Sequence, residues 1–140
     1  MIMGTPQKPI PAEIRIGVTG HRNVTAQPGI LREIRAVLAE IDGILEDTPH
    51  RYRVISPLAE GADRIVAQVV LGWEGPAGAP ALDVILPFEE NEYLRDFRTP
   101  SSRDEFAALL GRAASTVVFA ARGTREEGYE EAGHAVVDRC

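Results

Sequence analysis

The sequence predicts an α/β fold in which a parallel sheet is covered by helices. Short apolar runs suited to buried strands, such as IRIGV (14–18), recur along the chain. Between them lie longer stretches whose apolar residues are three or four positions apart, for example Ile34, Leu38 and Ile41. Regular alternation of strand and helix is typical of parallel sheets, because consecutive parallel strands need a helix-length connection.

The first strand and the first helix are joined by a loop that contains His21 and Arg22. The run 14–18 has the length and apolar character of a buried strand. Pro28 suits the first turn of the following helix, where its missing N–H would have no partner. We expect this helix to cover 30–45, because its apolar residues share one face and the polar segment EDTPH follows it.

The rest of the chain repeats this alternation. Ser102 and Glu105 have capping-box spacing, which predicts a helix N-terminus at that point. Right-handed crossovers limit the strand order, and we predict the order 3-2-1-4 with strand 14–18 in the centre. The other predicted elements are strand 52–56, a helix around 65–70, strand 82–88, a short turn within 89–97, a helix within 99–113, strand 115–121 and helix 126–140.

Length and composition indicate one globular domain. The chain has 140 residues, of which 44% are hydrophobic and 26% are charged, the profile of an ordinary globular protein. We divide it into a flexible N-terminal leader, 1–13, which contains three prolines, and a folded domain, 14–140.

Several partners and locations are disfavoured. No apolar run approaches the ~20 residues of a membrane helix, and the N-terminus lacks a signal-peptide pattern. The single cysteine, Cys140, has no partner for a disulfide within the chain, so we expect a cytoplasmic protein. A net charge of −6 counts against nucleic acid as a partner. The three histidines lack metal-ligand spacing and the acidic clusters are typical of solvated surface, so we predict no metal site.

Two common nucleotide-binding motifs do not occur. GVTGHR (17–22) does not match G-x-G-x-x-G, and Ser56 stands where a dinucleotide-binding strand would end in an acidic residue. The pattern G-x-x-x-x-G-K-[ST] is missing as well. The sequence therefore argues against an ordinary dinucleotide dehydrogenase and against a P-loop enzyme.

Two polar loops are expected to meet at the carboxyl ends of the strands, where open parallel sheets bind ligands. Arg22 offers planar donors that match phosphate oxygens, and the helix start at Gly61 attracts anions through its free N–H groups. We therefore predict a site for a phosphate-bearing ligand such as a nucleotide. The candidate residues are Thr19, Gly20, His21 and Arg22 in the first loop, and Ser56, Glu60, Gly61, Ala62 and Asp63 in the second.

Each candidate also has a purely structural interpretation. Glycines after strands often serve only the turn, and Asp63 suits the first turn of a helix with or without a ligand. Arg22 could pair with Glu60 or Asp63, and His21 could bind a backbone carbonyl. Tyr129 is placed either to stack on a base or to pack in the core.

Five segments resemble, in their order and spacing, the SLOG superfamily, which is named for the SMF/DNA-processing proteins and the Lonely-Guy proteins. They are GVTGHR, ISPLAEGADRIVAQVVL, LDVILPFEENEYLRDF, FAALLGRA and GYEEAGHAVVDRC. The resemblance covers 14–140 and is nearest to a bacterial branch marked by G-H-R and S-x-L-A-x-G-A-D. It implies a Rossmann-like three-layer fold with a mostly parallel sheet. It also implies a nucleotide pocket at the strand tips, held by the residues of the two loops.

The chain departs from the family at two points. Lonely-Guy enzymes carry P-G-G-x-G-T-x-x-E, whereas ARGTREEGYEE (121–131) offers Gly123, Thr124 and Glu127 without the glycine pair. Such proteins also continue after VVDRC with another apolar strand. The resemblance therefore implies either that the sequence is a fragment of a longer protein or that the sheet lacks its usual C-terminal edge strand. In either case a second copy of the chain could pair with the exposed neighbouring strand.

Three functions follow. We favour a sensor or signalling module that binds a nucleotide, ADP-ribose or an NAD-derived ligand; relatives of this branch are linked to effector domains, so we expect a homo-oligomer or a fusion to one. The alternative is a phosphoribohydrolase or other nucleotide-cleaving enzyme of Lonely-Guy type, in which Glu60 or Asp63 polarises the sugar or activates water. The third is a scaffold module with a vestigial crevice, or a DNA-processing relative, against which the net acidity counts.

Overall fold

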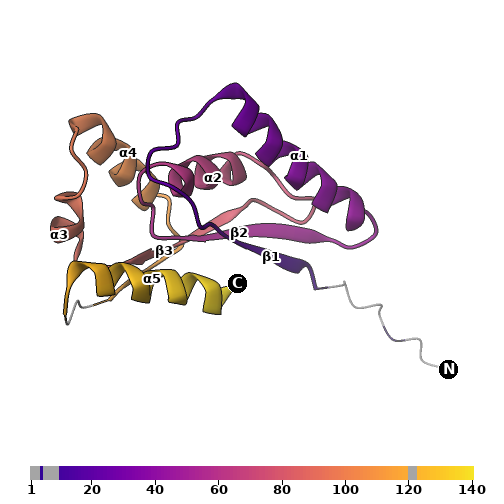
Figure 1. Ribbon diagram of the computed structural model, residues 1–140. Coiled ribbons are helices and arrows are strands. Elements are labelled where there is room, and N and C mark those ends of the chain that lie inside the picture. The colour runs from indigo at the N-terminus through magenta and orange to yellow at the C-terminus, as the bar shows by residue number, and fades with distance from the viewer. Residues whose placement is uncertain (1–3, 5–9, 120–122) are drawn as a thin grey trace.

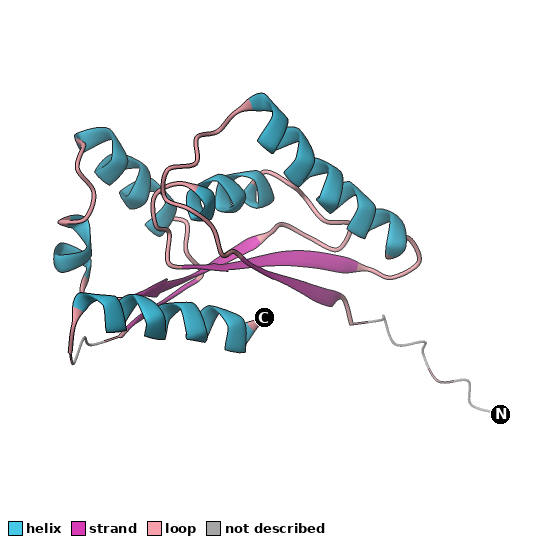
Figure 2. Cartoon of the chain, in the orientation of Figure 1, coloured by secondary structure: helices cyan, strands magenta, loops and turns pink. Residues whose placement is uncertain are grey.

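The computed structural model describes residues 4, 10–119 and 123–140. A four-stranded, all-parallel sheet lies between helices, so the predicted α/β, Rossmann-like three-layer fold is confirmed (Figures 1 and 2). The strands are β1 (Ala12–Gly17), β2 (His50–Ser56), β3 (Ala81–Leu86) and β4 (Ser115–Val118). The helices are α1 (Pro28–Ile44), α2 (Ala62–Leu71), α3 (Glu90–Leu94), α4 (Pro100–Leu110) and α5 (Arg125–Arg139).

The strand order is β1-β2-β3-β4, and the predicted order 3-2-1-4 is wrong. β1 lies at one edge of the sheet, and β4 pairs with β3 instead of β1. Phe106 and Leu109 of α4 belong to the same apolar core as the buried residues of α1 and α2. A right-handed crossover that keeps α4 on this face must continue the sheet in the same direction, which places β4 beyond β3.

Two apolar cores lie on opposite faces of the sheet. The larger core packs under α1, α2 and α4, and the smaller core packs under α5. Val54 and Ile55 are successive residues of β2 that point to opposite faces, and both are at most 1% exposed. Such continuous burial is typical of a parallel strand covered on both sides. The smaller core comprises Ile55, Ile85, Ala132 and Val136.

Helix α5 runs back across the sheet, so that the C-terminus lies near β1 (Figure 1). A Cβ atom added to Gly17 would lie 2.6 Å from Val136 Cγ1, so the glycine permits this close approach. Arg15 donates a hydrogen bond to the carbonyl of Arg139 at 3.0 Å. The last turn of α5 is thereby fastened to the edge strand.

The boundaries at the two ends of the chain differ from those predicted. β1 begins at Ala12, inside the predicted leader, because the Ala12 N–H donates to the carbonyl of Pro49 at 2.8 Å. Most of the leader (1–3 and 5–9) lies outside the described residues. β4 ends at Val118, and the last residues predicted for that strand, 120 and 121, also lie outside them.

The N-terminus of α4 lies earlier than the capping-box spacing predicted. Thr99 is the N-cap, and its Oγ1 accepts the N–H of Ser102 at 3.1 Å. Pro100 follows in the first turn, where it is favoured. The predicted cap, Ser102, is therefore the third helical residue, and its hydroxyl is available to other partners.

Candidate functional site

The two predicted loops do meet at the carboxyl ends of β1 and β2, and they meet through their backbones. The Ala62 N–H donates to the carbonyl of His21 at 3.2 Å. Gly61 has φ +87°, and a Cβ atom there would overlap the carbonyl oxygens of His21 and Arg22. A Cβ atom on Gly20 would lie 2.5 Å from Ala62 Cβ. The glycines therefore allow one loop to pack against the other. Because the Ala62 N–H donates to a backbone carbonyl, it is not free to bind a ligand.

Ser56 and Asp63 shape the second loop from inside the protein. Ser56 Oγ accepts the N–H of Leu58 at 3.0 Å, and the Asp63 carboxylate accepts the N–H of Ala59 at 3.2 Å. Burial raises the pKa of Asp63 to about 6, although the Ala59 N–H and the nearby Arg22 and Arg64 favour its charged form. Both side chains hold the loop conformation, which agrees with the structural interpretation of Asp63.

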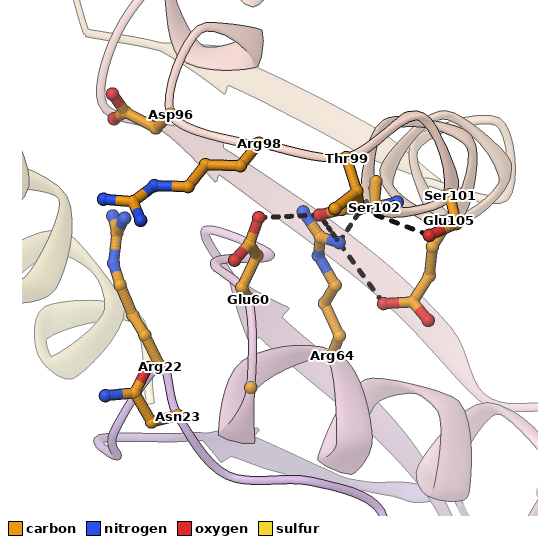
Figure 3. Close-up of a pocket in the computed structure, with 11 residues that line it drawn as sticks. Arg22, Asn23, Glu60, Arg64, Asp96, Arg98, Thr99, Ser101, Ser102 and Glu105 are labelled. Carbon is orange, nitrogen blue, oxygen red and sulfur yellow. Dashed lines mark hydrogen bonds and ion pairs between the residues drawn. The ribbon is translucent and has the colours of Figure 1, made fainter.

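A cavity of about 810 Å³ opens beside these loops (Figure 3). Arg22, Glu60 and Gly61 line it, which places three of the nine predicted residues at the cavity. Its other lining residues come from the loop after β1, from α2, from the segment after α3 and from the first half of α4. They are Asn23, Arg64, Asp96, Arg98, Thr99, Ser101, Ser102 and Glu105.

The other predicted residues lie elsewhere. Thr19 borders β1, Gly20 and Ala62 form the contact between the loops, and the exposed His21 contributes its backbone carbonyl to that contact. The family-derived positions Thr124 and Glu127 form the N-terminus of α5, where Thr124 Oγ1 accepts the Glu127 N–H at 3.2 Å.

The carboxylates around the cavity already have partners. Asp96 accepts two hydrogen bonds from Arg125, at 2.7 and 3.0 Å. Glu105 pairs with Arg64 at 3.3 Å. Glu60 accepts the hydroxyl of Ser102 at 2.7 Å, and within the described part of the chain no cation pairs with it. Glu60 is thus the carboxylate left to interact with a ligand.

Two arginines at the cavity carry no such partner. Arg22 and Arg98 are both exposed, and neither forms an ion pair with any described residue. Their guanidinium groups point toward one another in Figure 3. The Arg22 guanidinium lies over the ring of Tyr129, 4.8 Å from its centroid, which orients the side chain by a cation–π contact. Tyr129 itself packs against Phe88, with 5.3 Å between ring centroids.

Arg64 connects α2 to the start of α4 in the wall of the cavity. It is 2% exposed, and it donates to the carbonyls of Leu58 and Ser102, each at 2.9 Å. Its guanidinium lies 4.4 Å from the centroid of Phe97. Arg64 therefore ties α2 to the start of α4 and holds the Ser102 hydroxyl beside Glu60 (Figure 3).

Polar atoms without a partner lie beneath this wall. The hydroxyls of Tyr93 and Tyr129 and one carboxylate oxygen of Asp96 are buried and make no hydrogen bond to the described residues. Tyr93 is fully buried, and burial together with the negative charge of Asp63 raises its pKa. Its ring packs edge-on against Phe97 and Phe106, so its main role is in the core.

Eight of the eleven residues that line the cavity were not predicted from the sequence as site residues. Arg98 was not singled out, and the segment TPSS (99–102), which follows β3 and α3, was predicted only as part of a helix. A signal was available: an arginine followed by a threonine cap and two serines is a polar helix N-terminus at a strand tip. That this end faces the first loop depends on the strand order, which was predicted wrongly.

Comparison with protein-family models and with curated proteins gives no match for this chain. Across the described ranges, no group of three His, Cys, Asp or Glu side chains is arranged to hold a metal ion. Within the same ranges, no helix has the length and apolar character needed to cross a membrane.

Proposed function

We propose that the cavity binds a phosphorylated small molecule, a nucleotide or a nucleotide-derived ligand such as ADP-ribose, and that the protein acts as a sensor or signalling module. The pair Arg22 and Arg98 carries this proposal. Two exposed guanidinium groups that point toward one another repel, unless an anion lies between them. A phosphate group has enough acceptor oxygens to bind both arginines at once.

The remaining lining residues suit the rest of such a ligand. Ser101 lies in the first turn of α4, where the helix dipole favours negative charge. The Glu60 carboxylate is an acceptor suited to ribose hydroxyls. The cavity volume of about 810 Å³ falls within the roughly 300–1,000 Å³ of small-molecule sites.

The resemblance to the SLOG superfamily supports the same proposal. Its G-H-R and S-x-L-A-x-G-A-D segments both border the cavity, through Arg22 in the first and through Glu60 and Gly61 in the second. We accordingly propose that the chain is a SLOG-type domain of the bacterial branch, acting in the cytoplasm.

One observation favours the enzymatic alternative. Glu60 faces the cavity with a hydroxyl as its partner, so its carboxylate is accessible to activate water or to polarise a sugar. Asp63 is unsuited to this role, because its carboxylate is turned toward the Ala59 N–H. In a nucleotide-cleaving enzyme of Lonely-Guy type, Glu60 would therefore be the catalytic residue.

The experiment is a thermal-shift and calorimetric titration with AMP, ADP, ADP-ribose, NAD and cyclic nucleotides. We expect at least one of them to bind, and we expect Arg22→Ala and Arg98→Ala each to weaken that binding by about tenfold or more, the loss of a charge-assisted hydrogen bond. Arg35→Ala, an exposed arginine on α1, is the matched control and leaves binding unchanged.

Two outcomes contradict the proposal: no binding of any nucleotide at millimolar concentration, or binding that survives in the double variant of Arg22 and Arg98. If the protein releases free base or ribose phosphate from a nucleotide and Glu60→Gln abolishes this release, the protein is an enzyme. If a nucleotide binds and no product is released, the result supports the sensor function.

A further inference from the structure

The hydroxyl of Tyr93 is a buried polar group that the fold itself does not use. Tyr93 is fully buried, and its hydroxyl makes no hydrogen bond to any residue that the structure describes. Tyr52, another fully buried tyrosine, donates its hydroxyl to Asp42 at 2.5 Å. A buried polar group without a partner costs free energy, so the Tyr93 hydroxyl calls for a specific reason.

Aromatic packing explains the ring of Tyr93 but not its hydroxyl. The ring belongs to a cluster in which the centroids of neighbouring rings are between 4.9 and 6.3 Å apart. The other members are Phe88, Phe97, Phe106 and Tyr129. Three of these positions are phenylalanine, so the cluster packs without hydroxyls there, and a phenylalanine at position 93 would supply the same ring.

The Tyr93 hydroxyl lies behind the lining of the cavity. Burial raises the pKa of Tyr93, and the charge of Asp63 adds to this shift. The charges of Arg22 and Arg64 oppose it, which places both residues close to the hydroxyl. Asp96 also acts on Tyr93; its Oδ1 is bound by an arginine of α5, whereas its Oδ2 is buried and has no partner in the described ranges. Arg22, Arg64 and Asp96 all line the cavity.

Arg22 separates this polar region from the cavity. Its guanidinium lies over the half-buried ring of Tyr129, 4.8 Å from the centroid, and its end points toward Arg98 (Figure 3). The planar guanidinium thus occupies a ring face on which a flat group of a ligand can stack. A phosphate bound between the two arginines attracts the Arg22 side chain toward Arg98 and away from this ring face.

We propose that this region is a nucleobase subsite, in which a base stacks on Tyr129 in place of Arg22 and its polar edge binds the Tyr93 hydroxyl and Asp96 Oδ2. This inference rests on the proposed function, because the phosphate moves Arg22 off the ring. A hydroxyl donates and a carboxylate accepts, so the two groups match an edge that carries an acceptor beside an amino or N–H donor. Nucleobases present such an edge on a flat ring, which neither phosphate nor ribose offers.

Calorimetric titration with AMP, ADP, ADP-ribose and NAD, and with base-free ribose 5-phosphate, tests the subsite. We expect at least one nucleotide to bind about tenfold or more tightly than ribose 5-phosphate, because a stacked base adds affinity. Tyr93→Phe should weaken that nucleotide by about tenfold and leave ribose 5-phosphate unchanged. Tyr129→Leu should weaken the nucleotide as well, whereas Tyr129→Phe keeps the ring face and should retain stacking.

Tyr52→Phe is the matched control, because Tyr52 lies near the start of β2, away from the cavity, and its hydroxyl has a partner. We expect this variant to melt at a lower temperature and to bind nucleotides normally. Tyr93→Phe should show the opposite pattern, with a melting temperature at or above that of the original protein, because it loses no hydrogen bond to a described residue.

Three results overturn this inference alone. The first is ribose 5-phosphate that binds as tightly as every nucleotide. The second is full nucleotide affinity in Tyr93→Phe, which is expected if a buried water satisfies the hydroxyl. The third is a Tyr93→Phe variant that weakens ribose 5-phosphate as much as the nucleotides, which indicates a structural role. If neither the nucleotides nor ribose 5-phosphate bind, the proposed function is wrong and this inference is wrong with it.

Discussion

The contact between the two loops and the cavity beside it use their residues differently. In the loop contact, the Ala62 N–H donates to the His21 carbonyl, and Gly20 and Gly61 leave no room for a side chain between the loops. On the side of Arg22 and Arg98, charged groups line the cavity and form no ion pair with any described residue. The difference teaches that the glycines of this site maintain its architecture, whereas the arginines remain available to a ligand.

The largest expected effect tests the architectural side. Gly61→Ala places a Cβ atom against two carbonyl oxygens at a positive φ. We expect a strain of about 1–3 kcal/mol from the backbone conformation and a further overpacking cost of about 1–3 kcal/mol. Differential scanning calorimetry should show a melting temperature lower by roughly 10 °C.

Gly43→Ala is the matched control for this change. Nothing lies within 4 Å of a Cβ atom at Gly43, which is in the helix α1. We expect this variant to be more stable by about 0.5–1 kcal/mol, because alanine is favoured in helices. Equal melting temperatures for the two variants would contradict the architectural role of Gly61.

The second prediction concerns the two arginines, for which we expect a large effect on ligand affinity and a small effect on stability. The double variant Arg22→Ala, Arg98→Ala should lose about a hundredfold or more in affinity for whichever nucleotide the titration identifies. Because neither arginine forms an ion pair with a described residue, we expect the melting temperature without ligand to stay within a few degrees of the original. A large loss of stability would instead show that these arginines have a structural role, and it would contradict the prediction.

The third prediction concerns pH and Asp63. The pKa of Asp63 is raised from 3.8 to about 6 by burial, so between these two values the folded state holds a proton that the unfolded state has released. Its contribution to stability therefore falls as pH rises from about 4 to 6 and is constant above that range, a change of roughly 3 kcal/mol.

Asp63→Asn removes this titration and keeps an oxygen for the Ala59 N–H. Chemical denaturation at several pH values should show the difference in stability between the original protein and Asp63→Asn changing between pH 4 and 6, with the variant relatively more stable at pH 7. A difference that is independent of pH would contradict the burial of a charged Asp63.

The smallest expected effect tests the cap of α4. Thr99→Ala removes the oxygen that accepts the Ser102 N–H and should cost about 1 kcal/mol in the free energy of unfolding. Since Ser102 also binds Glu60, we expect a small loss of ligand affinity in parallel. Thr99→Ser keeps the accepting oxygen and should behave like the original protein in both measurements.

Local patterns were enough to predict most of the helices and strands and three of the eleven residues that line the cavity. The apolar run at β2 and the helical spacing in α1 predicted those elements within a few residues. The placement of Arg22 and Glu60 after parallel strands predicted that they would meet, because carboxyl ends of parallel strands share one edge of a sheet. These inferences depend on features that are local in the chain.

The strand order and the other cavity residues were decided only by tertiary packing. The burial of Phe106 and Leu109 with the residues of α1 and α2 decides which face α4 covers, and hence that β4 lies beyond β3. That arrangement brings Arg98 opposite Arg22 and leaves β1 at an edge. The alternation of strand and helix can be recognised from the sequence, but it is equally compatible with either strand order. The strand order depends on contacts between side chains that are far apart in the sequence and meet only in the folded protein, so only the tertiary structure determined it.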